Sequence, residues 1–313
     1  MSEAAGPSGP YILLDFGAGA FGGERLERWG DAVLVRPDVR ASGPRALPAD
    51  AWDRADAVYE GRLGGSGVGG GRWLPGRRRS TAAPLPDRWP IEHAGLRFSV
   101  GCAPSGHTGL FPEQAAHWHW MREALALRPA GAPAPEILNL FAYTGGASVA
   151  LAATGARVTH VDASRPAIGW ARANAEANQV DTIRWIPEDA RRFVERARRR
   201  GTRYDGVLLD PPAYGRGPAG DWRLDRDLGT LLEAAAAVLA PEPAFFLVNV
   251  YTGDLAAADL EGLLTWATGV DPAGQEGIEI DAGDLPLQAE DGRRLPTGVF
   301  ARWRRLPTKI QGD

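Results

Sequence analysis

The chain has 313 residues, of which 44% are hydrophobic and 24% are charged, and these are ordinary values for a globular protein. At roughly 150 residues per domain, the length suggests two domains or one large domain with an extension. No uninterrupted apolar run approaches the roughly 20 residues of a membrane span, which excludes a transmembrane helical protein. The net charge of −4 excludes a polycation, so contact with a nucleic acid would have to use a local basic patch.

Cysteine and histidine usage limits the chemistry that the chain can carry. The single cysteine, Cys102, excludes an internal disulfide and a cysteine-based zinc cluster. His117 and His119 lie two residues apart, on different faces of a helix, and no further ligand accompanies them, so we predict no metal site. The first residues lack the basic and long apolar segments of a secretory signal. We therefore expect a reduced, cytoplasmic protein.

The first hundred residues predict a small β-rich extension, because short apolar stretches alternate there with glycine and proline. The strand candidates are residues 11–14, 32–35 and 96–100. Seven of the eleven residues from Gly61 to Gly71 are glycine, which is typical of a flexible loop. We predict that residues 1–100 form this extension, with the Gly-rich loop at 61–71, and that residues 101–313 form a second domain.

From about residue 107 onward, short apolar runs alternate with long helical stretches that are rich in alanine, arginine and glutamate. The strand candidates are residues 137–140, 158–161, 183–186, 207–210 and 245–248. Helices are predicted to open near residues 145, 165, 190 and 224, with another over 255–267. This alternation predicts an α/β fold with a parallel sheet and crossover helices. Two last strand candidates, 277–280 and 298–303, predict a closing hairpin at the edge of the sheet.

Polar residues follow four of these strands, and ligands of open α/β sheets bind at the carboxyl ends of the strands. A glycine turn follows the first strand, and the acids Asp162, Asp189 and Asp210 follow the next three. The turn lacks the G-x-G-x-x-G pattern that encloses a pyrophosphate, while Asp162 can accept ribose hydroxyls and Asp189 an adenine amine. S-adenosylmethionine is a ligand with ribose and adenine but no pyrophosphate. A helix cap is the structural alternative for Asp162 alone.

Four motifs occur in order, and together they carry a family resemblance. They are Asn139-Leu-Phe-Ala-Tyr-Thr-Gly-Gly-Ala-Ser, Val161-Asp-Ala-Ser, Glu188-Asp-Ala and Leu209-Asp-Pro-Pro-Ala-Tyr-Gly-Arg-Gly. With them, residues 107–251 resemble the class I S-adenosylmethionine-dependent methyltransferases, in the branch that contains ribosomal RNA methyltransferases of the large subunit. The resemblance implies a Rossmann-like sheet of seven strands with an antiparallel closing strand, and S-adenosyl-L-methionine as the cofactor.

The resemblance also implies roles for individual residues. Asp162 would hold the ribose hydroxyls, Asp189 the adenine amine, and the backbone of Ala190 the adenine ring. The methionine end would be lined by Phe141, Tyr143 and Gly145. The segment 106–114 resembles an element that closes over the cofactor, in which Glu113 or Gln114 would meet the methionine amino group. The start of a helix is the structural alternative for that segment.

The sequence Asp210-Pro211-Pro212-Ala213-Tyr214 suits methyl transfer to a nitrogen. Asp210 and the carbonyl of Pro211 can accept the two hydrogens of an exocyclic amine, while Tyr214 stacks on the base. Pro212 has no N–H and stiffens the turn. Arg216, in the loop that follows, is the arginine most expected to touch the substrate. A plain strand ending is the structural alternative for this motif.

Methylation of cytosine at C5 requires a cysteine thiolate, and relatives in this branch that perform it carry the cysteine soon after the fifth strand. This chain has Leu-Val-Asn-Val-Tyr-Thr at 247–252, and Cys102 lies well before the first motif. We therefore predict an enzyme that methylates a nitrogen of a base in RNA, in particular ribosomal RNA. The alternatives are methylation of cytosine C5, a small-molecule or protein acceptor, and a non-catalytic RNA-binding module.

Overall fold

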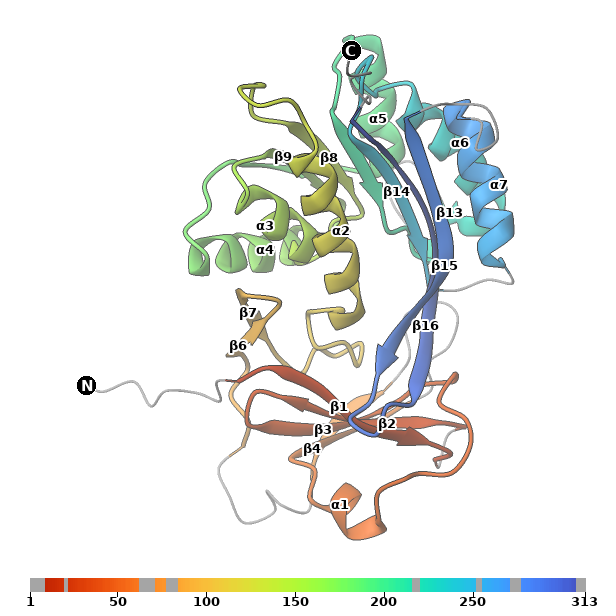
Figure 1. The fold of residues 1–313 in the computed structure, drawn as a ribbon. Coiled ribbons are helices and arrows are strands. Elements are labelled where there is room, and N and C mark those ends of the chain that lie inside the picture. Colours follow the sequence, from red (N-terminus) through yellow and green to blue (C-terminus); the bar gives the residue numbers. More distant parts are fainter. Residues whose placement is uncertain are drawn as a thin grey trace, which may run out of the picture. The chain divides into compact units, whose positions relative to one another are not determined.

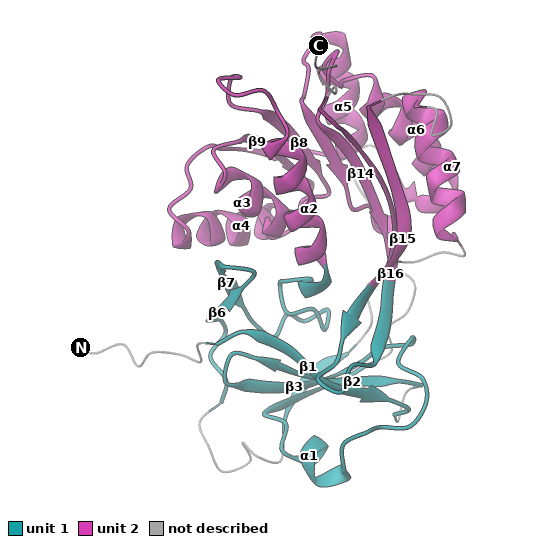
Figure 2. Cartoon of the chain, viewed as in Figure 1, with its two compact units in different colours: residues 1–113, 286–297 teal, residues 114–285, 298–313 magenta. Residues whose placement is uncertain are grey.

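The computed structural model describes residues 9–19, 22–61, 71–76, 84–215, 220–251, 255–270 and 277–307. The chain divides into two compact units, which Figure 2 colours separately. The N-terminal unit comprises residues 1–113 and 286–297, and the larger unit comprises residues 114–285 and 298–313. The domain boundary at residue 100 stays a prediction. Most of the predicted Gly-rich loop, residues 62–70, lies outside the described residues.

The N-terminal unit is rich in strands, as predicted. One sheet has five strands in the order β1 (Tyr11–Gly17), β2 (Glu24–Trp29), β3 (Ala32–Pro37), β4 (Ala57–Glu60) and β5 (Arg72–Pro75). A second, two-stranded sheet pairs β6 (Trp89–His93) with β7 (Leu96–Val100), and a short helix α1 covers Ala49–Asp53. The sheet of five strands is separate from the large sheet of the other unit.

A buried carboxylate lies at the centre of this N-terminal sheet. Glu27 of β2 is fully buried, and Arg36 of β3 donates to it through Nε at 2.6 Å and Nη2 at 3.0 Å. Arg25 lies 3.3 Å away, and the Tyr11 hydroxyl donates at 3.1 Å. Burial alone would raise the pKa of Glu27, but Arg25 and Arg36 outweigh it and hold the pKa below its usual value. Glu27 is therefore a buried, ionised group that depends on its partners.

The tip of the C-terminal hairpin belongs to the N-terminal unit. Strands β15 (Ile278–Gln288) and β16 (Arg294–Arg305) each contribute residues to both units. The apolar residues of the tip pack in one cluster with apolar residues of the N-terminal chain; its members are Leu13, Phe16, Ala41, Leu287, Ala289 and Leu295. Arg293 completes the attachment, because it pairs with Asp15 and donates to the Phe16 carbonyl at 3.0 Å.

The larger unit contains the predicted sheet of seven strands (Figure 1). Its order is β10 (Ile183–Pro187), β9 (Arg157–Asp162), β8 (Glu136–Leu140), β11 (Gly206–Leu209), β14 (Phe245–Val250), β16 and β15. The first five are parallel, and β16 runs antiparallel to β14. This confirms the predicted parallel sheet with a closing hairpin at its edge.

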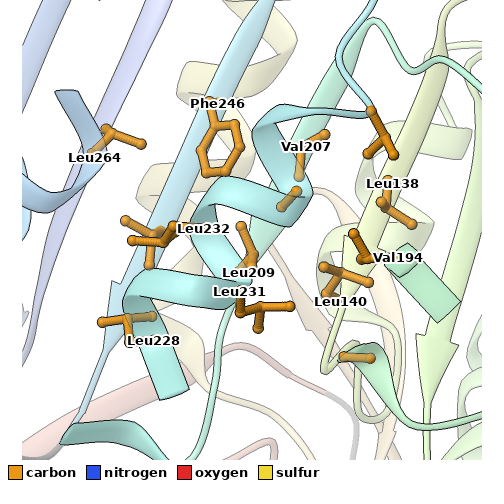
Figure 3. Close-up of a cluster of buried hydrophobic side chains, with 14 of the residues drawn as sticks. Leu138, Leu140, Val194, Val207, Leu209, Leu228, Leu231, Leu232, Phe246 and Leu264 are labelled. Atoms are coloured by element: carbon orange, nitrogen blue, oxygen red, sulfur yellow. The ribbon is translucent and has the colours of Figure 1, made fainter. Parts of the chain in front are cut away.

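Helices cover both faces of this sheet. They are α2 (Ala115–Ala126), α3 (Gly146–Ala152), α4 (Arg165–Ala177), α5 (Ala190–Arg199), α6 (Leu224–Ala236) and α7 (Ala257–Thr268). Helices α5, α6 and α7 share one apolar core with alternate strand residues such as Leu138 and Leu209, part of which Figure 3 shows. The intervening residue Asn139 faces the other side, where it contacts Ser148 of α3. In the part of the chain that the structure describes, no helix is long and apolar enough to cross a membrane.

Candidate active site

The register of the parallel strands aligns the predicted site residues. Leu140 is the register partner of Val161 and of Leu209, and Leu209 is also the partner of Val248. The residue that follows each of these four partners in the chain therefore lies at the same height in the sheet. These residues are Phe141, Asp162, Asp210 and Asn249. All of them lie at the carboxyl edge of the sheet, where such folds bind ligands.

The glycine turn after β8 is tightly folded. Phe141 and Tyr143 have φ angles of +56° and +48°, which side-chain-bearing residues rarely adopt, and Gly145 has a φ of +83°. A Cβ atom at Gly145 would lie 2.9 Å from the Cβ of Ala171 in α4. The backbone N–H of Ala142 also donates to Val161 of β9 at 3.1 Å. The strained turn therefore requires glycine at 145, and such strain gathers at functional sites.

Asp162, the last residue of β9, holds this turn in place. Its Oδ2 accepts the backbone N–H of Tyr143 at 2.8 Å, and its Oδ1 accepts that of Ser164 at 2.8 Å. Burial raises the pKa of Asp162, and the two backbone hydrogen bonds oppose the rise. Each oxygen keeps a second lone pair, which suits the two neighbouring hydroxyls of a ribose. Ser164 itself caps α4, because its hydroxyl oxygen accepts the backbone N–H of Ala167 at 3.3 Å, and the helix opens near residue 165 as predicted.

Asp189 begins helix α5 at the end of the neighbouring strand β10. Its Oδ1 accepts the backbone N–H groups of Arg191 and Arg192, at 3.0 and 3.2 Å, and so caps the helix. Its Oδ2 has a long contact of 3.4 Å with the Arg191 side chain. Ala190 is the buried first residue of the helix. The contacts of Asp189 and Ala190 with adenine stay predictions. The helix cap holds the Asp189 carboxylate in a fixed position, as the predicted contact with the adenine amine requires.

Asp210 follows β11 and is held by two amide side chains. Asn249 of β14 donates to its Oδ1 at 3.0 Å, and Gln114 donates to its Oδ2 at 3.3 Å. Gln114 also donates to the hydroxyl of Tyr251 at 2.9 Å. These residues therefore form one polar group around the carboxylate, although we had predicted a methionine contact for Gln114, which stays a prediction. Glu113 belongs to the N-terminal unit, where it is buried, and its predicted role also remains a prediction.

Asn249 and Tyr251 were not predicted as site residues. The sequence does contain one indication of Asn249, because it is the polar residue in the otherwise apolar strand Phe-Phe-Leu-Val-Asn-Val. In the structure this residue is fully buried. Buried amides are nearly always hydrogen-bonded, so such a residue at the carboxyl end of a central strand indicates a partner in the site.

Trp222 connects the loop after Asp210 with the glycine turn. Its indole N–H donates to the carbonyl of Pro212 at 2.6 Å, and its ring centroid lies 5.3 Å from that of Phe141. The carbonyl of the preceding residue, Pro211, is the one that we predict to accept a hydrogen bond from a substrate amine. Trp222 is buried, so it fixes the backbone on which this carbonyl depends.

Tyr214 lies on a short two-stranded sheet beyond the prolines. Strand β12 (Tyr214–Gly215) pairs with β13 (Trp222–Arg223), and the Tyr214 ring is half-buried. This pairing orders the segment on which a stacking aromatic residue was predicted. Arg216 lies outside the described residues, so its predicted substrate contact stays a prediction.

Comparison with known proteins agrees with this geometry. Residues 72–252, more than half of the chain, match the pattern of the S-adenosylmethionine-dependent methyltransferase family. The chain belongs to this family. A solved S-adenosylmethionine-dependent methyltransferase from Agrobacterium tumefaciens is 33% identical and superposes with a TM-score of 0.81 over 97% of both chains. The structure of SMU.776 complexed with SAH has the same fold, with a TM-score of 0.65 and 20% identity over 90% of this chain and 71% of that one.

Curated relatives match a shorter stretch of this methyltransferase. Ribosomal RNA large subunit methyltransferase K/L of Chromohalobacter salexigens is 33% identical over 160 residues, which are 50% of this chain and 20% of that protein. Ribosomal RNA large subunit methyltransferase I of Vibrio campbellii is 31% identical over 134 residues, or 41% of this chain and 32% of that protein. The chain thus spans 20% and 32% of the length of these two relatives. The family confirms the predicted enzyme class and S-adenosylmethionine as methyl donor.

Proposed function

We propose that this methyltransferase methylates a nitrogen of a base in RNA, with ribosomal RNA of the large subunit as its substrate. The observation that carries the proposal is the carboxylate of Asp210, which Asn249 and Gln114 hold at the carboxyl end of β11, directly before Pro-Pro-Ala-Tyr. The names of the curated relatives support a ribosomal RNA substrate.

The residues that bind the methyl donor and those that bind the acceptor lie on different strands along this edge of the sheet. Strands β10, β9 and β8 carry the residues predicted to bind S-adenosylmethionine, which supplies an electrophilic methyl group when bound. The next two strands, β11 and β14, carry the acceptor side. There, Asp210 and the carbonyl of Pro211 accept the hydrogens of an amine and orient its lone pair, while Tyr214 stacks on the base. This arrangement orients a nitrogen without forming a covalent bond to the base.

Attack on cytosine C5 would need a thiolate at the same place. Residues 247–251 are Leu-Val-Asn-Val-Tyr, and the Tyr251 hydroxyl there accepts a hydrogen bond from Gln114. The only cysteine, Cys102, is half-buried, and burial raises the pKa of its thiol to about 12. A thiol with such a pKa is almost entirely protonated at neutral pH and is a poor nucleophile.

The test compares Asp210→Ala with Cys102→Ala in one assay, with tritiated S-adenosylmethionine and ribosomal RNA from cells that lack the enzyme. Asp210→Ala should bind the methyl donor normally and lose turnover, because its interaction is made chiefly in the transition state. Cys102→Ala should retain the wild-type rate. Mass spectrometry of the labelled nucleosides then identifies the methylated atom, which we expect to be a nitrogen.

Two results would overturn the proposal. An inactive Cys102→Ala enzyme that still binds the methyl donor, together with a covalent adduct on 5-fluorocytosine RNA, would establish C5 chemistry instead. Methyl transfer to small molecules or proteins, with no label in any RNA, would establish a different acceptor class.

A further inference from the structure

Three buried or partly buried polar side chains lie on the side of the sheet that helix α2 covers, and the last of them contacts Asp210. They are Arg302 of β16, His117 of α2 and Asn249 of β14. His117 and Asn249 are almost inaccessible, at 1% and 0% exposure. The proposed reaction assigns no task to His117, and burying a polar group is costly unless it is hydrogen-bonded.

Arg302 determines which nitrogen of His117 carries a proton. Its guanidinium donates to Asp281 at 2.9 Å and lies over the rings of Trp120 and Phe300, at 4.6 and 4.5 Å from their centroids. Its Nη1 lies 3.2 Å from Nδ1 of His117. A guanidinium only donates hydrogen bonds, so Nδ1 must be the acceptor, and the neutral ring carries its hydrogen on Nε2.

The sheet register places Asn249 beside this ring. Phe300 is the register partner of Asn249 across β14 and β16, and the ring of His117 packs against Phe300 with centroids 4.8 Å apart. His117 Nε2 and Asn249 Oδ1 are both buried, and no hydrogen-bond partner within 3.5 Å is found for either atom among the described residues. Burial and then Arg302 lower the pKa of His117 to about 3, while a hydrogen bond with Asn249 opposes the fall. The ring is therefore neutral at physiological pH.

We propose that His117 is a positioning residue, whose Nε2–H donates to Oδ1 of Asn249 and thereby directs the Asn249 amide nitrogen at Asp210. An asparagine amide can rotate so that its oxygen and nitrogen exchange places. The exchanged orientation would turn Oδ1 toward the carboxylate and Nδ2 toward another N–H, so both hydrogen bonds would be lost. The fixed donor in His117 removes this second orientation.

The consequence concerns the acceptor half of the site and rests on the proposed role of Asp210. With Asn249 fixed, Asp210 has amide donors on both of its oxygens, and the lone pairs that remain are aimed in fixed directions. An amine would then meet a carboxylate of defined orientation. Small misplacements of such a group, even ones caused from a distance, reduce the rate of the chemical step strongly.

The first test reads the tautomer directly and does not depend on methyl transfer. Long-range ¹H–¹⁵N spectra of the whole protein should show His117 neutral, with its proton on Nε2, from pH 7 down to pH 5. The side-chain amide of Asn249 should be protected from exchange. A proton on Nδ1, or titration of His117 above pH 5, would contradict the assignment, whether or not the proposed reaction is correct.

The second test uses substitutions with a matched control. His117→Phe should lower kcat by roughly a hundredfold and leave the affinity for S-adenosylmethionine within about twofold. His119→Phe is the control, because His119 is exposed on the same helix and pairs with the exposed Glu123 side chain. In an Asn249→Ala background, His117→Phe should cause no further loss, since it acts through Asn249.

Additive losses in the double variant would show that His117 does not act through Asn249. A loss of donor affinity equal to the loss of kcat would show a general structural role and would also overturn the proposal. If His117→Phe fails to fold, the spectra of the wild-type protein still test the assigned His117 tautomer, because they require no variant. If the wild-type protein methylates no RNA but shows the Nε2 tautomer, the proposed function fails while the positioning contact stands.

Discussion

The two carboxylates nearest the centre of the site are held in different ways. Asp162 accepts two backbone N–H groups, from Tyr143 and Ser164, so its position is fixed by the course of the chain. Asp210 accepts from two side-chain amides, Asn249 and Gln114, so its position depends on residues that single substitutions can remove. The first arrangement suits a fixed ligand holder, and the second suits a group whose orientation determines the reaction.

Asp162→Ala should weaken the binding of S-adenosylmethionine. The change removes the predicted acceptor of two ribose hydroxyls, a loss of roughly 2 to 4 kcal/mol after partial replacement by water. This corresponds to at least about a tenfold rise in Kd, measured by calorimetry. Asp181→Ala, at an exposed acid before β10, is the control and should bind normally. Unchanged affinity in a folded Asp162→Ala protein would contradict the ribose assignment.

How far the site could be predicted depended on where each residue lies in the chain. Asp162, Asp189 and Asp210 lie at the end of a strand or within two residues after it, so the sequence pattern alone predicted that they share one edge of the sheet. Tyr251 and His117 contribute through partners that are 137 and 185 residues away in the chain, as the contacts with Gln114 and Arg302 show. No local sequence pattern predicts contacts between residues so far apart in the chain, because the residues become neighbours only in the folded structure.

At the scale of elements, the glycine turn and helix α4 approach each other closely. We expect Gly145→Ala to weaken donor binding, because a methyl group there would lie 2.9 Å from the Cβ of Ala171 at a φ of +83°. Gly155→Ala is the matched control, since Gly155 has a φ of +88° but no atom within 4 Å of the added carbon. Both variants should lose about 1 to 2 kcal/mol of stability from the backbone conformation.

The affinities of the two variants should differ, and calorimetry with S-adenosylmethionine measures this directly. Only Gly145→Ala displaces the turn, so only this variant should bind more weakly. Equal affinities would show that the close approach of the turn and α4 does not shape the donor site.

Glu27→Gln tests the buried charge of strand β2. Removing one partner of a buried ion pair costs roughly 3 to 5 kcal/mol at neutral pH. The pKa of Glu27 is lowered in the folded chain, so its stabilisation is complete above the unfolded value of roughly 4.3 and is lost as the pH falls through the folded value. The difference from the wild-type protein should therefore be largest at pH 7 and shrink below about pH 4.

Hydrogen exchange of peptides from β2 and β3 measures this difference in the N-terminal unit itself. Glu60→Gln is the control, because Glu60 is exposed and its contact with Arg72 is 3.6 Å long. It should change stability by less than about 0.5 kcal/mol. A pH-independent difference for Glu27→Gln would show that the charge of Glu27 is not what stabilises the sheet.

The same strand shows why some elements escaped prediction. Strand β2 reads Glu-Arg-Leu-Glu-Arg-Trp, and its buried glutamate hides the alternation of apolar and polar residues that marks a half-buried strand. Helix α2 was not among the predicted helices, and its Trp-His-Trp run has no clear polar face that would mark an amphipathic helix. The strands and helices of the parallel sheet were predicted well, since their apolar runs alternate with long helical stretches.

At the scale of the whole molecule, the two compact units share one hairpin. We expect residues 114–313, produced alone, to associate, because Leu287 and Leu295 would lose the apolar partners that bury them to 5% and 0% exposure. Light scattering after size exclusion measures the association. Replacing both leucines by threonine in this fragment should restore a monodisperse protein. A monodisperse fragment with both leucines intact would contradict the expectation.

The shared hairpin also sets an order of events during synthesis. Domains usually fold as units while the ribosome is still working, the N-terminal one first. Here the first 113 residues leave the ribosome without the segment 286–297 that completes their apolar cluster. The large sheet is likewise incomplete until β16 pairs with β14, and the last residue of β16 is Arg305. Neither unit can therefore reach its final state before the hairpin has been synthesised, and until then the nascent chain exposes apolar surface that chaperones can bind.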